Sequence, residues 1–316
     1  MTSRRAFLGA AAGALILPGA LLRGAAASGL PAEVRIGYQK EGILAVVKQR
    51  ATIEARLAQL GAITVRWVEF QYGPPMMEAL GAGSIDIGSV GDTPPIFAQA
   101  AGAPVVYIAH TQAAQHGILV PANSSVRGVA DLKGKTVAIA RGSSAHNFTI
   151  QALKKAGLAF GDVRPAYLAP AEFVPAFTGG TVDAWAVWDP YFALAELRHG
   201  GRAIATSAVD YPSNSFYLAN RAFAERQGRV LAAVVDELRL TYVWADQNRA
   251  QVAALIAEVT GVELPAQERT VRRLRIELEP IDDAAIAQQQ EIADSFAALG
   301  LLPRPIVVRD AVWRHP

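Results

Sequence analysis

Apolar and polar positions in the first half of the chain follow two alternating periods. Short apolar runs such as residues 34–38 are typical of buried strands, whereas residues 43–60 carry apolar side chains at helical spacing and stop at Gly61. The expected strands are residues 34–38, 63–68, 85–88 and 104–109, and the expected helices are residues 43–60, 94–101 and one that starts at 76–80. This alternation predicts a mainly parallel sheet with helices on both faces.

The pattern then restarts, so a second α/β module of similar size follows the first. Its expected strands are residues 136–140, 165–168, 182–187 and 203–206, and its expected helices are residues 145–156, 171–177 and 190–198. No low-complexity linker separates the modules, so we expect strand-like crossings near residues 110–120 and 212–220. From Arg221 onward the sequence predicts mainly helix, with amphipathic stretches around residues 229–247, 250–260 and 283–299.

Residues 1–27 have the order of a cleavable export signal. Arg4 and Arg5 precede an apolar stretch over residues 6–22, and three alanines end the segment at Ala27. The paired arginines predict the twin-arginine route, cleavage after Ala27 and a periplasmic protein. The alternative is a membrane anchor, but glycines and Pro18 interrupt the run, which is short for a hydrocarbon core of about 30 Å.

Composition excludes several classes of protein. The 316 residues are 52% hydrophobic and 18% charged, which is typical of a globular chain of about two domains. There is no cysteine, so disulfides, thiolate metal sites, cysteine nucleophiles and a lipid anchor are excluded. The net charge of +2 depends on three arginines in residues 1–27, and no basic patch for nucleic acid remains. Nucleotide-binding, zinc-protease and hydrolase motifs are absent, and the five histidines lack ligand spacing. We therefore expect no cofactor, no metal and no catalytic residues.

Three turns lie where a predicted strand ends and a helix begins, at residues 88–95, 141–147 and 188–191. Thr93 is a candidate N-cap ahead of Pro94, and Asp189 can cap a helix that begins at Pro190. Gly142 allows a close approach to the backbone, and the two serines after it can cap a helix or donate hydroxyl groups. In open α/β sheets, ligands bind beyond the carboxyl ends of the strands, and a helix N-terminus offers free N–H groups to an anion.

These turns predict a site for a small anion if they face each other across a cleft, although each turn alone is also compatible with simple helix capping. Asp92 and Asp189 would repel an anion, so we expect them to bond to the backbone or to a polar part of the ligand. His146 lies in a first helical turn, where the dipole disfavours its protonation, and is either a neutral donor or a packed residue. Trp185 and Trp188 either lie in the core or form an apolar wall.

Longer segments of the chain resemble the aliphatic sulfonate-binding proteins of ABC importers. The resemblance runs over essentially the whole predicted mature chain. It is carried by IGYQK at 36–40, VEF at 68–70, GSIDIG at 83–88, GDTPPIFAQA at 91–100, DLKG at 131–134, GSSAHN at 142–147, VDAWAVWDPY at 182–191 and SFYL at 215–218. Binding proteins for nitrate, taurine and pyrimidine precursors are broadly similar, so the resemblance specifies the family more sharply than the ligand.

The resemblance implies an α/β protein with the type II periplasmic binding fold, with two lobes and two hinge crossings. We expect lobe 1 to comprise residues 28–115 and 218–316, and lobe 2 residues 116–217. It also implies a monomer that captures an organosulfonate between the lobes and delivers it to an ABC permease with a cytoplasmic ATPase, for sulfur acquisition. Taurine, nitrate or another small organic anion is the alternative ligand. Enzymes of carbon–sulfur chemistry on this scaffold use a cysteine, which this chain lacks. A sensor role without transport is a further alternative.

Carried over residue by residue, the resemblance implies a ligand pocket of twelve residues. They are Gln39, Gly91, Asp92, Thr93, Gly142, Ser143, Ser144, His146, Trp188, Asp189, Ser215 and Phe216. Backbone and hydroxyl groups of the first two turns would hold the sulfonate, Gln39 would add a donor, and Trp188 and Phe216 would flank the carbon chain. Two departures bear on specificity. Ala145 stands where many relatives have a third serine, and Glu41 stands where a small or neutral residue is more usual.

Overall fold

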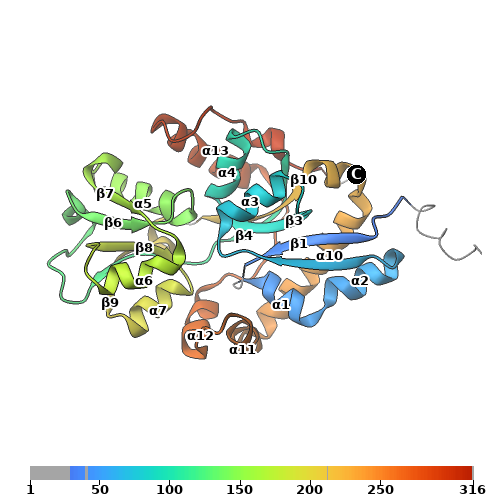
Figure 1. Cartoon of the computed structure of the whole chain (residues 1–316), viewed down its shortest axis with the longest axis horizontal. Helices are drawn as coiled ribbons and strands as arrows, with labels where there is room; N and C mark the ends of the chain where they lie inside the picture. Colours follow the sequence, from blue (N-terminus) through green and yellow to red (C-terminus); the bar gives the residue numbers. More distant parts are fainter. Residues whose placement is uncertain (1–28, 40–41, 212, 315–316) are drawn as a thin grey trace, which may run out of the picture.

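The computed structural model describes residues 29–39, 42–211 and 213–314, and the predicted export signal lies outside this range. Two five-stranded sheets lie next to each other along the long axis (Figure 1). The first has the order β2-β1-β3-β10-β4 and the second β7-β6-β8-β5-β9. The strands of the first are β1 (Glu33–Tyr38), β2 (Thr64–Glu69), β3 (Ile87–Gly91), β4 (Val105–Gln112) and β10 (Asn214–Asn220). Those of the second are β5 (His116–Pro121), β6 (Thr136–Ile139), β7 (Arg164–Tyr167), β8 (Ala184–Trp188) and β9 (Gly201–Thr206).

The predicted α/β fold class is confirmed, but each sheet is mixed and only partly parallel. In the first sheet β1 runs parallel to β2 and β3, and in the second β6 runs parallel to β7 and β8. β10 is antiparallel to β3 and β4, and β5 is antiparallel to β8 and β9. The chain enters β5 and β10 directly from the other sheet, without the crossover helix that links neighbouring parallel strands. These two strands can therefore run antiparallel to their neighbours.

Helices cover both faces of each sheet. The first sheet is flanked by α1 (Ile43–Arg50), α2 (Thr52–Gly61), α3 (Gly73–Gly81), α4 (Thr93–Ala100), α9 (Arg221–Arg226), α10 (Gly228–Gln247), α11 (Arg249–Thr260) and α13 (Asp283–Ala298). The second is flanked by α5 (Ser144–Lys155), α6 (Pro170–Thr178), α7 (Tyr191–Arg198) and the short α8 (Ser207–Asp210). The predicted helix over residues 43–60 is in fact two, because Ala51 adopts a left-handed conformation with φ 50°. Three single 3₁₀ turns, Val129–Leu132, Phe160–Asp162 and Val308–Ala311, complete the fold.

α12 (Leu264–Arg273) belongs to the C-terminal segment but lies at the junction between the two halves, below them in Figure 1. It packs against α11, which in turn packs against α1 of the first half. It also packs against α7 of the second half. We use "first lobe" for the first sheet with its helices and the C-terminal segment, and "second lobe" for the second sheet with α5–α8.

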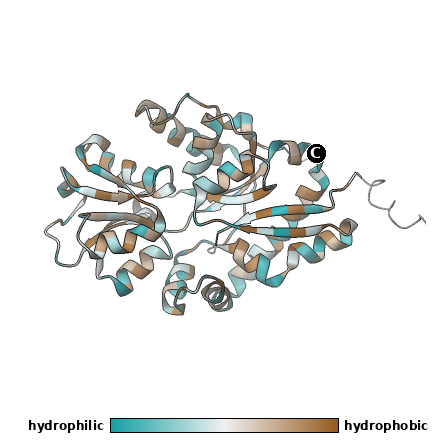
Figure 2. Ribbon diagram, in the orientation of Figure 1, coloured by the Kyte–Doolittle hydropathy of each residue, from teal (hydrophilic) through white to brown (hydrophobic). Residues whose placement is uncertain are grey.

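The cores follow the alternation of side chains along the strands. In the first lobe, one core lies between the sheet and α1, α2, α10 and α11, and another lies between the opposite face and α3, α4 and α13. A third core fills the second lobe around Trp185 and Phe173. Figure 2 shows apolar and polar residues alternating along β1 and β2, as expected for strands whose two faces differ in burial. No described helix is long and apolar enough to span a membrane.

Two segments connect the lobes. Residues 113–115 join β4 to β5, and residues 207–213 join β9 to β10. Residues 214–217, predicted for the second lobe, belong to β10 and pair with β3 and β4 of the first sheet, so the second crossing ends before Asn214. The apolar run at 216–219 marks a strand but does not say which sheet it joins.

Candidate ligand-binding cavity

A cavity of about 150 Å³ lies between the lobes and takes its walls from both. The first lobe contributes residues of β3, β10 and α12, and the second contributes residues of α5 and β8. Seven of the twelve predicted pocket residues line it: Gln39, Gly91, Ser143, Ser144, Trp188, Asp189 and Ser215. The cavity therefore lies where two of the predicted turns meet across the lobes.

The first turn brings the lobes into contact. A Cβ atom built on Gly91 would lie 2.0 Å from the Ser144 Oγ of the second lobe, so any side chain at position 91 would force the Ser144 hydroxyl to move. Asp92 is buried and accepts hydrogen bonds from Thr93 Oγ1 at 2.8 Å and from Asn147 Nδ2 at 3.0 Å. Burial raises the pKa of Asp92, and hydrogen bonds from Thr93, Ser144 and Asn147 partly offset that effect. Asp92 thus bonds α4 to α5 and does not line the cavity.

The predicted cap at Thr93 is shifted by one residue. α4 begins at Thr93, and Asp92 occupies the N-cap position without a side-chain capping bond. Thr93 is fully buried and donates its hydroxyl to Asp92, so neither hydroxyl nor carboxylate faces the cavity. The first turn therefore presents the backbone of Gly91 to a ligand in the cavity.

The second turn has the geometry that its sequence predicts. Gly142 has φ 71°, a left-handed conformation that favours glycine. Ser143 is the N-cap of α5 and accepts a hydrogen bond from the backbone N–H of His146 at 3.4 Å. Its hydroxyl also donates to the carbonyl of Ala140 at 2.7 Å. Ser144 follows at the first helical position and lines the cavity, so the positive end of the α5 dipole points toward the cavity.

His146 is a packed, neutral residue that lies away from the cavity. Its ring contacts Phe160, Tyr167 and Phe296, and its Nδ1 accepts a hydrogen bond from the backbone N–H of Gly142 at 3.3 Å. Burial, with a smaller contribution from Arg141, lowers the pKa of His146 to about 4. Of the two alternatives left open by the sequence, the structure favours packing, and His146 holds the Gly142 turn in place.

The third turn carries a charge into the cavity wall. Asp189 is 2% exposed, precedes a cis bond to Pro190, and accepts a hydrogen bond from the backbone N–H of Ala193 in α7 at 3.0 Å. Burial raises the pKa of Asp189 to about 6, although Arg273 acts in the opposite direction. Arg273 Nη1 lies 3.2 Å from Asp189 Oδ1.

The aromatic wall differs from the prediction at one position. Trp188 lines the cavity and packs against Phe173, whereas Trp185 is fully buried in the core. Phe216 does not flank the cavity. It packs against Tyr107 at 5.0 Å between ring centroids, on the face of β10 that is turned toward the core. Because neighbouring strand residues point to opposite faces, Ser215 and Tyr217 face the cavity in its place.

The remaining predicted residues have structural roles or lie outside the described range. Gln39 Nε2 donates to the carbonyl of Ser89 at 3.1 Å, so this side chain is already bonded while it lines the cavity. Gly142 shapes its turn without lining the cavity. Glu41, whose departure from the family pattern bears on specificity, is outside the described residues.

Sequence reasoning missed the contribution of the C-terminal segment and of the crossing strands. Further lining residues are Thr111, His116, Tyr217, Tyr242, Gln267, Thr270, Leu274 and Arg275. A helix signal is present at α12, where Pro265 occupies a first-turn position. Nothing local to that signal says that the helix lies over the other lobe. No group of His, Asp and Glu side chains within the described part of the chain could hold a metal ion.

Comparison with known proteins identifies the family. The model of the NMT1-like family matches residues 29–258. The chain is 40% identical over 293 residues to an aliphatic sulfonates-binding protein of Escherichia coli K12, covering 92% of this chain and 91% of that protein. The chain belongs to the NMT1-like family.

Solved structures agree with this assignment and with the expected group of aliphatic sulfonate-binding proteins, which is confirmed. The alkanesulfonate-binding protein SsuA of Xanthomonas axonopodis pv. citri, bound to MOPS, matches with a TM-score of 0.85 and 40% identity, over 90% of this chain and 99% of that one. The periplasmic aliphatic sulphonate-binding protein SsuA of Escherichia coli matches with a TM-score of 0.82 and 40% identity, over 91% and 94%.

Proposed function

We propose that this NMT1-like protein binds aliphatic sulfonates in the cavity between its lobes and delivers them to an ABC permease. The observation that carries the proposal is the meeting of Gly91 with Ser144 at the N-terminus of α5, inside a cavity walled by Trp188. A helix N-terminus and a hydroxyl suit an anionic head group, and an indole suits a carbon chain. The two SsuA proteins named above support the same ligand class by their likeness to the whole chain.

The same reasoning favours binding without turnover. The chain contains no cysteine, the nucleophile that enzymes of carbon–sulfur chemistry on this scaffold use. The Escherichia coli relative and the SsuA structures named above are binding proteins. We therefore assign the cavity to capture and release of the ligand. For residues 1–27 we propose export by the twin-arginine route and cleavage after Ala27.

The pocket residues that we assign to the ligand are Gly91, Ser144, Trp188 and Ser215, with Ser143 and Gln39 beside them. Asp92, Thr93, Gly142 and His146 act behind them, because each is bonded within or next to the turns that shape the cavity. A bulky aromatic wall favours an organic tail over a bare inorganic ion, which ranks alkanesulfonates above nitrate.

Thermal unfolding against a ligand panel tests this function. The chain from residue 28 onward, purified in phosphate buffer, is heated with propanesulfonate, octanesulfonate, MOPS, taurine, sulfate or nitrate. A ligand at one hundred times its Kd adds about 2.7 kcal/mol to stability, which raises Tm by several degrees. We expect a rise with alkanesulfonates and none with nitrate or sulfate. No rise with any sulfonate would contradict the proposal, and sulfite release from a sulfonate would contradict a purely binding role.

A further inference from the structure

The cavity holds a buried carboxylate where an anion should bind. Asp189 is one of two side chains with a formal charge among the described lining residues, and the other, Arg275, is paired with Glu277 and Glu279. An uncompensated negative charge at Asp189 would oppose a sulfonate, because charges interact strongly where water is largely excluded. The cavity therefore needs something to neutralise Asp189.

Arg273 is the group that meets this need. Its Nη1 lies 3.2 Å from Asp189 Oδ1 and 3.3 Å from Oδ2, and its guanidinium lies over the Phe192 ring at 4.6 Å. Its Nη2 donates to Glu196 Oε2 at 2.5 Å. Arg269 also contacts Glu196, at 3.2 Å, so Glu196 has a second cation whereas Asp189 depends on Arg273. The two carboxylates and two guanidiniums form a balanced group.

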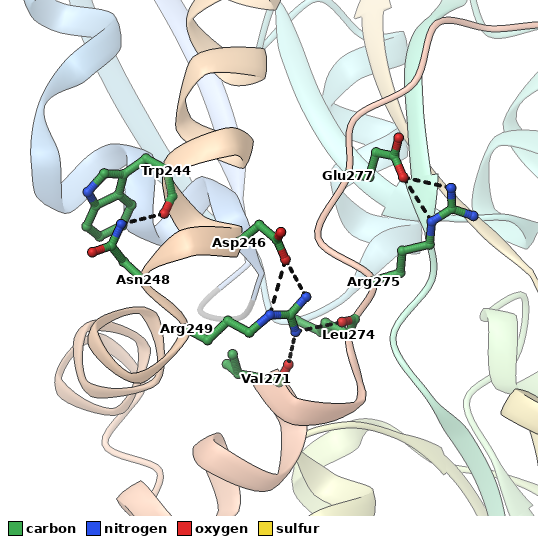
Figure 3. Close-up of polar contacts among 8 residues, drawn as sticks. All are labelled: Trp244, Asp246, Asn248, Arg249, Val271, Leu274, Arg275 and Glu277. Carbon is green, nitrogen blue, oxygen red and sulfur yellow. Dashed lines mark hydrogen bonds and ion pairs between the residues drawn. The ribbon is translucent and has the colours of Figure 1, made fainter.

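The four charged side chains of this group come from both lobes. Asp189 and Glu196 belong to the second lobe, while Arg269 and Arg273 belong to α12 of the first. Figure 3 shows how the end of α12 is fixed: Arg249, at the start of α11, donates to the carbonyls of Val271 at 3.0 Å and Leu274 at 2.9 Å. Arg249 is itself paired with Asp246 at the end of α10. Arg273 is therefore presented to Asp189 from the opposite lobe, by a helix that the first lobe holds.

We propose that Arg273 is a positioning residue for anion capture, which neutralises Asp189 when α12 meets the second lobe. The approach of the lobes then removes the charge that would repel the ligand, so the cavity accepts an anion in the closed arrangement. This inference rests on the proposed sulfonate-binding function and deepens it. It assigns to α12 an electrostatic role that requires no direct contact between Arg273 and the ligand.

Isothermal titration with propanesulfonate at pH 8 tests the inference on four variants. We expect Arg273→Gln to weaken binding by roughly tenfold or more, because the Asp189 carboxylate that stays ionised at pH 8 then has no cation beside it. Adding Asp189→Asn in the same chain should restore the affinity to within about threefold of the wild type, because the carboxamide carries no charge and still accepts from the Ala193 N–H. Arg273→Lys keeps the charge and should retain most of the affinity. Asp189→Asn alone should bind propanesulfonate more tightly than the wild type, because the carboxylate that opposes the anion is gone while Arg273 keeps its charge.

Arg198→Gln is the matched control. Arg198 pairs with Glu263 across the same α7–α12 contact but lies at the exposed end, away from the cavity. If Arg273 only helped α12 to dock, Arg198→Gln and Arg273→Gln would weaken binding alike and Asp189→Asn would not rescue, and either result would overturn the inference.

A pH profile adds a readout that docking alone would not move. Arg273 and Glu196 are the charged groups that face Asp189. In Arg273→Gln, lowering the pH from 8 to 5.5 should restore propanesulfonate affinity as Asp189 becomes protonated. This rise should begin at a higher pH than any rise in the wild type, because Arg273 lowers the pKa of Asp189, which is about 6 when Arg273 is present. An equal response in both proteins would contradict the inference. If the wild type bound no sulfonate, the proposed function itself would fail, whereas binding that Arg273→Gln leaves unchanged would overturn the inference alone.

Discussion

Gly91 of the first lobe and Ser144 of the second lie so close that a side chain at position 91 would occupy the place of the Ser144 hydroxyl. The distance from an ideal Gly91 Cβ to Ser144 Oγ is 2.0 Å, and to Ser144 Cβ it is 3.1 Å. The two residues meet beside the cavity, where Gly91 is the last residue of β3 and Ser144 is the first residue of α5. With a side chain at position 91, the lobes could keep this approach only if the Ser144 hydroxyl moved.

Gly91→Ala should therefore weaken sulfonate binding by roughly tenfold while leaving each lobe folded. The added methyl must displace the Ser144 hydroxyl, and overpacking of this kind typically costs about 1–3 kcal/mol. Titration calorimetry with propanesulfonate measures the affinity, and circular dichroism checks the fold.

The matched control is Gly91→Ala combined with Ser144→Ala, which removes the atom at 2.0 Å but leaves the one at 3.1 Å. If the clash causes the loss, the second substitution should cost less affinity in the Gly91→Ala protein than in the wild type. Equal costs in the two backgrounds would mean that the contact does not limit the approach of the lobes.

The two serines of the second turn should separate into a ligand contact and a structural cap. Ser144→Ala should weaken sulfonate binding by about 1–3 kcal/mol, because it removes a hydroxyl that lines the cavity and is hydrogen-bonded to the Asp92 carboxylate where the lobes meet. Ser143→Ala should mainly lower the free energy of unfolding, by about 1 kcal/mol, because its hydroxyl caps α5 and donates to Ala140. Calorimetric affinity and urea denaturation measure the two quantities. The opposite division of effects would show that Ser143 carries the ligand contact.

Burial of two histidines should make the fold less stable in acid. Burial lowers the pKa of His116 and of His146 to about 4, so between pH 6.5 and 4 the unfolded chain binds protons that the folded protein does not. The free energy of unfolding should fall as the pH falls through this window, by up to about 3 kcal/mol for each histidine. Asp189, whose pKa is raised to about 6, acts in the opposite sense between 3.8 and 6. Urea denaturation at pH 7, 6, 5 and 4.5 measures the slope.

His146→Phe should flatten this slope without changing sulfonate affinity by more than about twofold, because His146 lies outside the cavity. It should also lower stability at pH 7 by about 1 kcal/mol, because the Gly142 N–H loses its acceptor. His199→Gln, outside the core, is the control and should leave the slope unchanged. A large loss of sulfonate affinity in His146→Phe would contradict this prediction and would indicate that His146 contacts the ligand.

Trp188 and Trp185 should report on binding differently. Trp188 lines the cavity and Trp185 does not, so a change in tryptophan fluorescence on adding octanesulfonate should disappear in Trp188→Phe and persist in Trp185→Phe. Loss of apolar wall should also weaken octanesulfonate binding by about 1 kcal/mol in Trp188→Phe. Trp185→Phe should instead lower Tm, since Trp185 is fully buried. A fluorescence change that survives in Trp188→Phe would remove Trp188 from the ligand wall.

Features that depend on local sequence were predicted well. The alternation of strand and helix signals, the restart after residue 136 and the cap at Ser143 each follow from chemistry within a few residues. The glycine at 142 likewise has the backbone conformation that its turn requires. The predicted helix start at Pro190 is shifted by one residue: α7 begins at Tyr191 with Pro190 at the N-cap, and Asp189, one residue earlier, accepts from the Ala193 N–H.

Features that depend on which face or which lobe a residue meets were not predictable in this way. Phe216 and Tyr217 are neighbours of similar character, and only the sheet that β10 joins decides which one faces the cavity. His146 and Asp92 look like ligand contacts because they adjoin the turns, yet partners far away in sequence, Phe296 and Gln289, bury them. The meeting of Arg273 with Asp189 depends on the packing of α12 across the lobes and leaves no local signature.

The position of β4 in the first sheet has a consequence for the order of folding. This eight-residue strand pairs with β10 and makes single bridges to Glu279 and Val312, so within the described chain every strand partner of β4 lies beyond residue 213. The buried backbone N–H and C=O groups of β4 therefore lack their strand partners until the segments that follow the second lobe have been synthesised. A ribosome-bound intermediate that ends before β10 can complete the second sheet but not the first, so the lobe that begins the chain is the last to become stable.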